Sequence, residues 1–209
     1  MTVILSDLDG VLVDSHASIM RAWRWWGALH GVQSAAIEGV QQGRPSGEVI
    51  ASLAPGLDAE AESRAIDLRQ ADDTDGVIAL PGASQLLAGS DPVAVVTSCT
   101  VPLATARLRA AGLPVPEVLV TPERLSRGKP DPEGYLVALE RLNETLAAPL
   151  APADVLVFED SDHGLAAAVA AGMRCIVIEG TTPAERLGAA EALIPALDWS
   201  VPALRESLP

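Results

Sequence analysis

The sequence predicts an α/β fold with a parallel β-sheet, and three observations lead to this class. Five short apolar runs are rich in valine and isoleucine, lack an alternating polar face and are typical of strands buried on both sides: Val3–Leu5, Val93–Val96, Val118–Val120, Val155–Phe158 and Cys175–Ile178. Helical patterns lie between the runs, at about Pro102–Ala111 and Gly164–Ala171. Each of these two patterns ends before a glycine, as helices often do. Strand–helix alternation of this kind indicates a parallel sheet.

The composition limits the classes of protein and partner. A chain of 209 residues with 49% hydrophobic residues can bury the core of one domain, and no apolar run reaches the roughly 18 residues that span a bilayer. Asp and Glu number 28 against 14 Lys and Arg, which argues against a nucleic-acid backbone as partner. Cys99 and Cys175 have no metal-type spacing, and no export signal is visible. We therefore expect a reduced, cytoplasmic, monomeric protein without a membrane or nucleic-acid partner.

A long segment interrupts the alternation after the first strand. It begins with a helical pattern that places Ile19, Trp23 and Trp26 on one face, and it continues through the turn-rich Gly43–Gly47. We expect a small helical insert over residues 15–80, located above the strand ends. Residues 1–14 and 81–209 then form the core domain.

Polar residues follow the apolar runs, at the place where parallel sheets carry their chemistry. Carboxylates follow the first and fourth runs, two hydroxyls follow the second, and a lysine loop follows the third. These residues are Asp7 and Asp9, Glu159 and Asp160, Thr97 and Ser98, and Lys129. Because the carboxyl ends of parallel strands meet at one edge, we expect these side chains to form one site.

The four carboxylates need a partner if they lie close together. Two like charges about 4 Å apart repel by roughly 4 kcal/mol at an effective dielectric constant near 20. Either some of the carboxylates keep their protons or a cation is bound. A set of oxygen ligands without His or Cys suits Mg²⁺, and the hydroxyls and Lys129 can donate to phosphate oxygens. The set therefore indicates phosphoryl transfer.

The two aspartates of the first strand end allow a division of labour. Asp7, directly after the strand, can attack phosphorus and form an acyl phosphate. Asp9, two residues further on, can protonate the leaving alcohol and then activate water. Gly10 permits the tight turn that both positions need.

Four motifs carry a family resemblance: DLDGVLVDS at Asp7–Ser15, VVTSCT at Val95–Thr100, GKPDPEGY at Gly128–Tyr135 and FEDSDHG at Phe158–Gly164. Their order and spacing resemble those of the haloacid dehalogenase-like hydrolases over nearly the whole chain. The insert resembles the helical cap of the subgroup that contains small-molecule phosphatases and β-phosphoglucomutase. Its segments AWRWWG and GRPS are most similar to the sugar-phosphate and glycerol-3-phosphate phosphatases.

The resemblance implies a Rossmann-like parallel sheet core with a small helical cap inserted after the first strand. It also implies that the first and fourth strands are neighbours. The implied roles are Asp7 as nucleophile, Asp9 as acid/base, Lys129 with Thr97 or Ser98 as phosphate-binding groups, and Asp7, Asp160 and the backbone carbonyl of Asp9 as Mg²⁺ ligands supported by Glu159.

Some positions depart from the family pattern and concern the substrate. Where the family often has His-Gly-Arg, this chain has Gln42-Gly43-Arg44, so Arg44 and Gln42 are our candidates for substrate contact by the cap. A solvated arginine is an equal alternative for Arg44. Cys99, at a position that is often glycine, is interpreted as a small buried residue rather than a redox sensor. His163 can line the site or cap a helix.

The leading interpretation is a Mg²⁺-dependent phosphatase that hydrolyses a small phosphorylated sugar or polyol through an aspartyl-phosphate. A phosphosugar mutase is the first alternative. Mutases of this type carry a histidine ten residues beyond the acid/base aspartate, where this chain has Ile19, and the nearby His16 is three residues off.

Two further alternatives belong to other classes. A receiver-type phospho-acceptor would carry its accepting aspartate after the third strand and would lack the large insert. A silent binding protein would usually have lost one of Asp7, Asp9, Lys129 or Asp160, and all four are present. If the insert is a mobile cap, we expect its hinges near Asp14–Ser15 and Leu80–Gly82.

Overall fold

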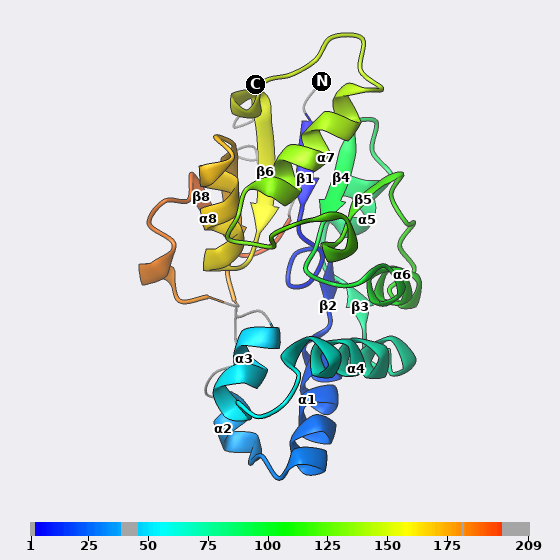
Figure 1. Ribbon diagram of the computed structural model, residues 1–209. Helices are drawn as coiled ribbons and strands as arrows, with labels where there is room; N and C mark the ends of the chain where they lie inside the picture. The colour runs from blue at the N-terminus through cyan, green and yellow to red at the C-terminus, as the bar shows by residue number, and fades with distance from the viewer. Residues whose placement is uncertain (1–2, 39–45, 181, 198–209) are drawn as a thin grey trace.

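The computed structural model describes residues 3–38, 46–180 and 182–197, and its centre is a parallel sheet of six strands (Figure 1). The strand order is β5-β4-β1-β6-β7-β8, and every neighbouring pair is parallel. The strands are β1 (Val3–Ser6), β4 (Val93–Val96), β5 (Val118–Val120), β6 (Val155–Glu159), β7 (Arg174–Ile178) and β8 (Ala192–Ile194). The predicted α/β class and its parallel sheet are confirmed, and β1 and β6 are neighbours.

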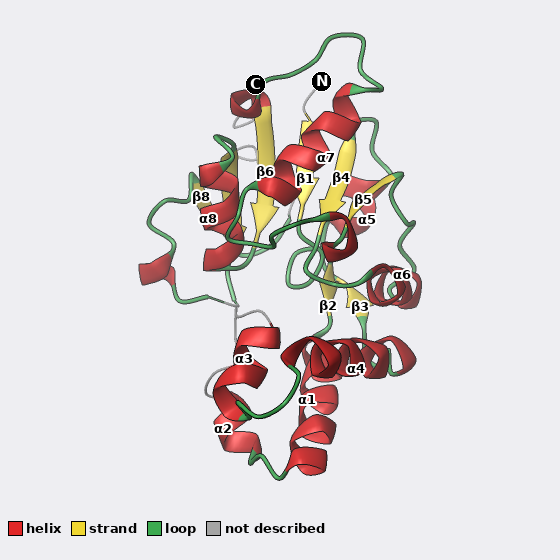
Figure 2. Ribbon diagram, in the orientation of Figure 1, coloured by secondary structure: helices red, strands yellow, loops and turns green. Residues whose placement is uncertain are grey.

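Helices cover both faces of this sheet (Figure 2). On one face, α7 (Glu133–Asn143) and α8 (Asp162–Ala170) pack on Val3 and Leu5 of β1. On the other face, α5 (Ala83–Leu87) and α6 (Val101–Ala110) pack on Ile4. Successive residues of a strand point to opposite faces of the sheet, and both faces are covered by helices. All of these β1 side chains are therefore buried, which explains why the run is apolar without alternation. Three short 3₁₀ turns lie in the connections, at Pro122–Arg124, Pro152–Asp154 and Ala184–Arg186.

Four helices form a bundle beyond the carboxyl ends of the strands, below the sheet in Figure 1. They are α1 (His16–His30), α2 (Ser34–Glu38), α3 (Ser46–Leu53) and α4 (Ala59–Asp72). The bundle has its own apolar core, in which the Trp23 and Trp26 rings meet edge to face with their centroids 5.5 Å apart. Ile19 also packs against this core. The indole Nε1 of Trp26 donates to Glu62 at 2.8 Å, so its polar atom is satisfied inside the bundle.

A two-stranded antiparallel ribbon joins the bundle to the sheet. It pairs β2 (Val13–Asp14) with β3 (Ile78–Ala79), and the amide of Leu80 adds a hydrogen bond to the carbonyl of Leu12 at 2.9 Å. The two chain segments that link bundle and core therefore run side by side. Their positions coincide with the residues at which the sequence predicts hinges.

Two polar residues, Asp14 and Ser15, directly precede α1. The N-cap position is occupied by Ser15, whereas Asp14 precedes it and accepts a hydrogen bond from the amide of His16 at 3.1 Å. The Ser15 hydroxyl donates instead to Asp9 Oδ1 at 2.5 Å.

None of the described helices combines the length and the apolar character that crossing a bilayer requires.

Candidate active site

Parallel pairing of β1 with β6 brings the two acidic motifs together. Ser6 lies opposite Phe158 in the register, and the amide of Asp7 donates to the Phe158 carbonyl at 2.9 Å. Asp7, the first residue after β1, therefore lies beside Glu159 and Asp160 at the edge of the sheet. One carboxylate oxygen from each of Asp7, Glu159 and Asp160 lies within 4.8 Å of the other two. All three residues are at least nine-tenths buried.

Lys129 is the cation at the centre of this group and the only lysine in the sequence. Its ammonium donates to Asp7 Oδ1 at 2.6 Å, to Glu159 Oε1 at 2.5 Å and to the carbonyl of Val96 at 2.9 Å. Burial by itself lowers the pKa of Lys129, but the Asp7 and Glu159 carboxylates outweigh it and hold the pKa above that of an ordinary lysine. The ammonium therefore stays charged in the buried site.

Glu159 anchors the lysine. It is fully buried, and its Oε1 accepts from Lys129 and from the Tyr135 hydroxyl at 2.6 Å. Its Oε2 accepts from the amides of Asp160 and Ser161 at 3.1 and 3.3 Å and from the Ser161 hydroxyl at 3.1 Å. Burial raises the pKa of Glu159, but the lysine and these donors outweigh it and hold the pKa below the ordinary value. Tyr135 is a site residue that sequence reasoning missed.

The space for Glu159 depends on a glycine in α8. A Cβ added to Gly164 would lie 1.9 Å from Glu159 Oε1, which is far inside contact distance. We expect Gly164→Ala to displace this carboxylate and to lower the free energy of unfolding by about 1–3 kcal/mol, despite the better helix propensity of alanine. Urea unfolding measures this loss.

The matched control for this prediction is Gly47→Ala in α3. The added methyl group there meets only the Ser63 hydroxyl, at 3.7 Å. We expect this variant to keep or raise the urea midpoint. Equal midpoints for the two alanine variants would contradict the steric account of Gly164.

The cluster carries more negative than positive charge. Asp7, Glu159 and Asp160 contribute three carboxylates, and Lys129 contributes one cation. Burial, followed by the charges of Glu159 and Asp9, raises the pKa of Asp7 to about 7, even though Lys129 acts in the opposite direction. A buried set of oxygen donors with excess negative charge fits a hard divalent cation. The site could therefore hold a metal ion.

The turn after β1 brings its backbone against Asp160. Gly10 has a φ of +78°, and a Cβ at this position would lie 2.1 Å from Asp160 Oδ2. Its amide donates to the Val13 carbonyl at 2.9 Å, which closes the loop that carries Asp9. Both the left-handed backbone and the close approach require glycine here.

Asp9 lies at the edge of the cluster and has partners of its own. Besides the Ser15 hydroxyl at Oδ1, its Oδ2 accepts from the Cys99 thiol at 3.0 Å and from Nη1 of Arg107. Cys99 is buried, and burial raises the pKa of its thiol well above the ordinary value. The interpretation of Cys99 as a small buried residue therefore agrees with its surroundings.

Arg107 is the second residue that sequence reasoning missed. It lies on the buried face of α6, beside Leu103, Ala104 and Leu108. The signal in the sequence is an arginine at the spacing of an otherwise apolar helix face.

The two hydroxyl candidates follow β4, whose last carbonyl, that of Val96, accepts from Lys129. Thr97 is buried, and its Oγ1 accepts from the amide of Cys99 at 3.1 Å, whereas Ser98 is exposed. The cap candidates Gln42 and Arg44 lie outside the described residues.

Two further polar residues have defined surroundings. His163, at the start of α8, lies with its Nδ1 3.2 Å from Asp162 Oδ1. Asp131 accepts from the amide of Glu133 at 3.0 Å and pairs with Arg127 at 3.1 Å, so it shapes its loop.

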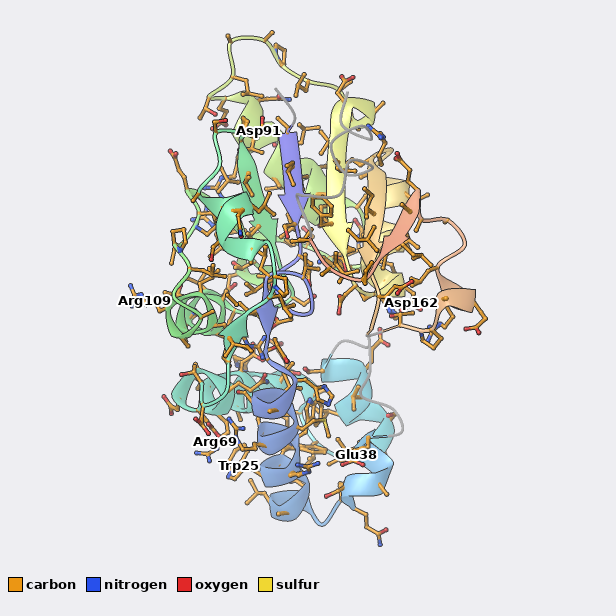
Figure 3. All side chains as sticks on the ribbon, turned by 180° about the vertical axis from the view of Figure 1, so that it is seen from behind. Trp25, Glu38, Arg69, Asp91, Arg109 and Asp162 are labelled. Atoms are coloured by element: carbon orange, nitrogen blue, oxygen red, sulfur yellow. The ribbon has the colours of Figure 1, made fainter. Side chains whose placement is uncertain are left out.

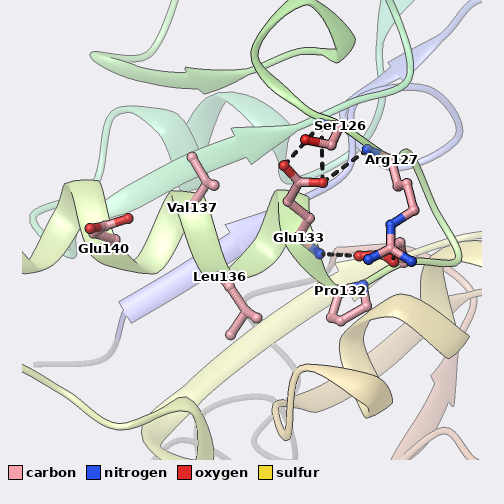
Figure 4. A pocket seen from close by; sticks show the side chains of 8 residues that line it. Ser126, Arg127, Pro132, Glu133, Leu136, Val137 and Glu140 are labelled. Carbon is pink, nitrogen blue, oxygen red and sulfur yellow. Dashed lines mark hydrogen bonds and ion pairs between the residues drawn. The ribbon is translucent and has the colours of Figure 1, made fainter.

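The loop that carries Lys129 is anchored at the start of α7. The Glu133 carboxylate accepts from the amide of Ser126 at 2.9 Å and from that of Arg127 at 2.9 Å (Figure 4). These hydrogen bonds lower the pKa of Glu133 below its ordinary value. On the side of the bundle, a cleft of about 590 Å³ is lined by Glu48 of α3 and by residues 127–132. The cleft connects the lysine loop with the bundle.

Comparisons with known proteins show the family to which the chain is related. The sequence model of the haloacid dehalogenase-like hydrolases matches residues 1–172. The chain is 36% identical over 201 residues to hexitol phosphatase A of Escherichia coli K12, covering 93% of this chain and 90% of that protein. It is 34% identical over 202 residues to validoxylamine A 7′-phosphate phosphatase of Streptomyces hygroscopicus subsp. limoneus, covering 92% of each.

A solved structure shows the same fold. CbbY from Rhodobacter sphaeroides in complex with phosphate superimposes with a TM-score of 0.78 at 27% identity, covering 94% of this chain and 95% of that one. The family resemblance and the prediction of a phosphoric monoester hydrolase are confirmed. The chain therefore belongs to the haloacid dehalogenase-like hydrolase family.

Proposed function

We propose that this protein is a Mg²⁺-dependent phosphatase that hydrolyses a small phosphorylated sugar or polyol through an aspartyl-phosphate. The observation that carries the proposal is the buried ion pair between Asp7 and Lys129, with the Asp160 carboxylate beside it and Asp9 two residues away. The printed names of two relatives, a hexitol phosphatase and a validoxylamine 7′-phosphate phosphatase, support the substrate class.

The first half of the reaction transfers the phosphoryl group to the enzyme. A carboxylate oxygen of Asp7 forms a bond to phosphorus while the ester bond between phosphorus and the alcohol oxygen breaks. The electron pair of that bond stays on the alcohol oxygen, which takes a proton from Asp9. Lys129 and Thr97 or Ser98 hold the phosphoryl oxygens during this step.

The second half returns the enzyme to its starting state. Asp9, now a carboxylate, takes a proton from a water molecule, whose oxygen bonds to phosphorus. The bond between phosphorus and the Asp7 oxygen breaks, and inorganic phosphate leaves. Both halves use the same two aspartates. The short hydrogen-bonded turn around Gly10 keeps these aspartates at a fixed separation.

Asp7, Asp160 and the backbone carbonyl of Asp9 are the groups we propose to hold Mg²⁺. When bound, the ion supplies positive charge that stabilises the phosphoryl oxygens. Glu159 supports this site indirectly, because its two oxygens already accept hydrogen bonds from Lys129, Tyr135, Ser161 and the Asp160 amide. It thereby holds the lysine against Asp7.

The helical bundle, together with the other residues of 15–80, is proposed as a cap that opens for the substrate and closes for the reaction. The cleft beside Glu48 supports this role because it lies between the bundle and the lysine loop. The β2–β3 ribbon supplies the proposed hinges. Arg44 and Gln42 remain the proposed contacts between cap and substrate.

One observation disfavours the mutase alternative. Ile19 stands ten residues beyond Asp9, and it packs against the apolar core of the bundle together with Trp23. No histidine occupies that position to time proton transfer by Asp9. We therefore expect hydrolysis rather than interconversion of phosphosugars.

A panel of phosphorylated sugars and polyols tests the proposed function. We expect phosphate release in the presence of Mg²⁺ that disappears when EDTA is added and returns when Mg²⁺ is restored. Absence of release from every member of the panel would contradict the proposal. Release that is indifferent to EDTA would contradict the metal requirement alone.

A further inference from the structure

Arg107 is the arginine that the structure buries most deeply among the described residues, with 2% of its surface exposed. A buried guanidinium is unfavourable unless charged or polar groups surround it. Its Nη1 donates to Asp9 Oδ2 and contacts the Cys99 sulfur at 2.8 Å. Its Nη2 donates to the side-chain oxygen of Gln70, which is itself buried. The pKa of Arg107 stays above its ordinary value despite burial, because Cys99, Asp9 and Asp67 surround it.

These contacts connect three parts of the chain. Asp9 belongs to the loop after β1, Arg107 to the core helix α6, and Gln70 to the bundle helix α4. A second contact supports the same junction, because Asp67 of α4 bonds to Thr100 at the start of α6. The Arg107 guanidinium therefore bonds to Gln70 of the bundle on one side and to the Asp9 carboxylate of the core on the other.

We propose that Arg107 is a positioning residue for Asp9, and that Gln70 fixes the guanidinium in the orientation that this task requires. The proposal rests on the proposed function, in which Asp9 transfers the proton. Hydrogen bonds to both oxygens fix the orientation of the Asp9 carboxylate: the Ser15 hydroxyl donates to Oδ1, and the Arg107 guanidinium donates to Oδ2. A misplacement of about 1 Å in a catalytic group can lower the rate on the order of 100-fold.

Leaving groups of different basicity separate positioning from a purely structural role. An alkyl alcohol departs only when its oxygen receives a proton, so cleavage of sorbitol 6-phosphate depends on where Asp9 lies. Nitrophenolate departs as a stable anion, so cleavage of p-nitrophenyl phosphate does not need that proton. Comparing kcat/KM for the two substrates reports only the steps up to departure of the alcohol, and thus excludes the later hydrolysis of the aspartyl-phosphate.

We expect Arg107→Met to lower kcat/KM for sorbitol 6-phosphate by about 100-fold, within the range that proton transfer contributes, and for p-nitrophenyl phosphate by less than about fivefold. Arg107→Lys restores part of the loss, because its ammonium can reach one partner but not both. Gln70→Leu keeps the arginine and removes its outer acceptor, so we expect the same selectivity with a loss of about tenfold. In an Asp9→Asn background, Arg107→Met adds little further selectivity.

Arg109→Met is the matched control, because Arg109 lies on the same helix and is exposed (Figure 3). We expect this variant to keep both kcat/KM values. Equal losses on the two substrates, or no loss on either, in Arg107→Met would overturn the positioning role. If Arg107→Met does not unfold cooperatively and is therefore misfolded, Gln70→Leu provides the test. An unchanged ratio of the two kcat/KM values in Gln70→Leu would then overturn the positioning role. A wild-type protein that hydrolyses no phosphomonoester contradicts the proposed function itself, and the positioning role falls with it.

Discussion

We expect Asp7→Asn to lower phosphate release from every phosphomonoester by about 10⁴-fold or more, because an amide cannot replace the carboxylate that we propose as the nucleophile. The exchange is nearly isosteric, and the Asn oxygen can still accept from Lys129. Loss of binding geometry therefore does not explain the effect. Steady-state rates with the best substrate of the panel measure it, and residual activity above about 1% of the wild type would exclude Asp7 as the nucleophile.

The same variant makes the metal-free protein more stable at high pH. Burial raises the pKa of Asp7 from 3.8 to about 7, so the folded state keeps a proton that the unfolded state releases. The contribution of Asp7 to the free energy of unfolding is fully present below the pKa of the unfolded state, 3.8. It is lost as the pH rises through the pKa of the folded state, about 7. At pH 8 the charged Asp7 therefore opposes folding.

Urea unfolding in EDTA at pH 5 and pH 8 separates these regimes. We expect Asp7→Asn to raise the midpoint at pH 8 and to change it much less at pH 5. Asp14→Asn, at an exposed carboxylate of the same N-terminal stretch, is the control and should leave both midpoints unchanged. A midpoint for Asp7→Asn that falls at pH 8 would mean that the pair with Lys129 outweighs the repulsion among the carboxylates.

The second large effect is expected from Lys129→Met. This side chain has a similar length without the charge, so Asp7 and Glu159 lose their shared cation inside the protein. Leaving buried charges unpaired destabilises a protein by about 3–5 kcal/mol. Loss of the phosphate-binding donor lowers kcat by about 10²–10³-fold. We expect both changes at pH 8, and a smaller loss of stability at pH 5, where Asp7 can take up a proton.

Arg127→Met is the matched control for Lys129→Met. Arg127 belongs to the same loop and pairs with Asp131, but 78% of its side chain is exposed. Exposed ion pairs contribute about 0–1 kcal/mol. A loss of stability in Lys129→Met as small as that in Arg127→Met would contradict the role of Lys129 as the shared counterion.

The sheet could be predicted from the sequence because five of its six strands are contiguous apolar runs rich in valine and isoleucine. The exception, β8, is three residues long and only partly buried, so its local signal is weak. The β2–β3 ribbon consists of two residues on each side, which is too short for any periodicity. Such short elements are determined by long-range pairing.

The clustering of the carboxylates could also be predicted, because strand ends gather in a parallel sheet. Arg107 and Tyr135 could not. Arg107 meets Asp9 and Gln70 from 98 and 37 residues away, and Tyr135 meets Glu159 from 24 residues away. An arginine or tyrosine in a helix is usually exposed at its polar end. The apolar spacing around Arg107 in α6 is a weak signal of burial, and the packing of α6 and α7 on the sheet is needed to show that both polar ends point inward.

The most direct test of the central claim is to trap the intermediate on the residue that carries it. The enzyme is mixed with Mg²⁺ and its best substrate, quenched in acid within the first turnovers and reduced with borohydride, which converts an acyl phosphate of aspartate into homoserine. Peptide mass spectrometry then identifies the modified position. We predict homoserine at position 7 in the wild type and no homoserine in Asp7→Asn. Homoserine at another aspartate, or full hydrolysis without any trapped residue, would contradict nucleophilic attack by Asp7.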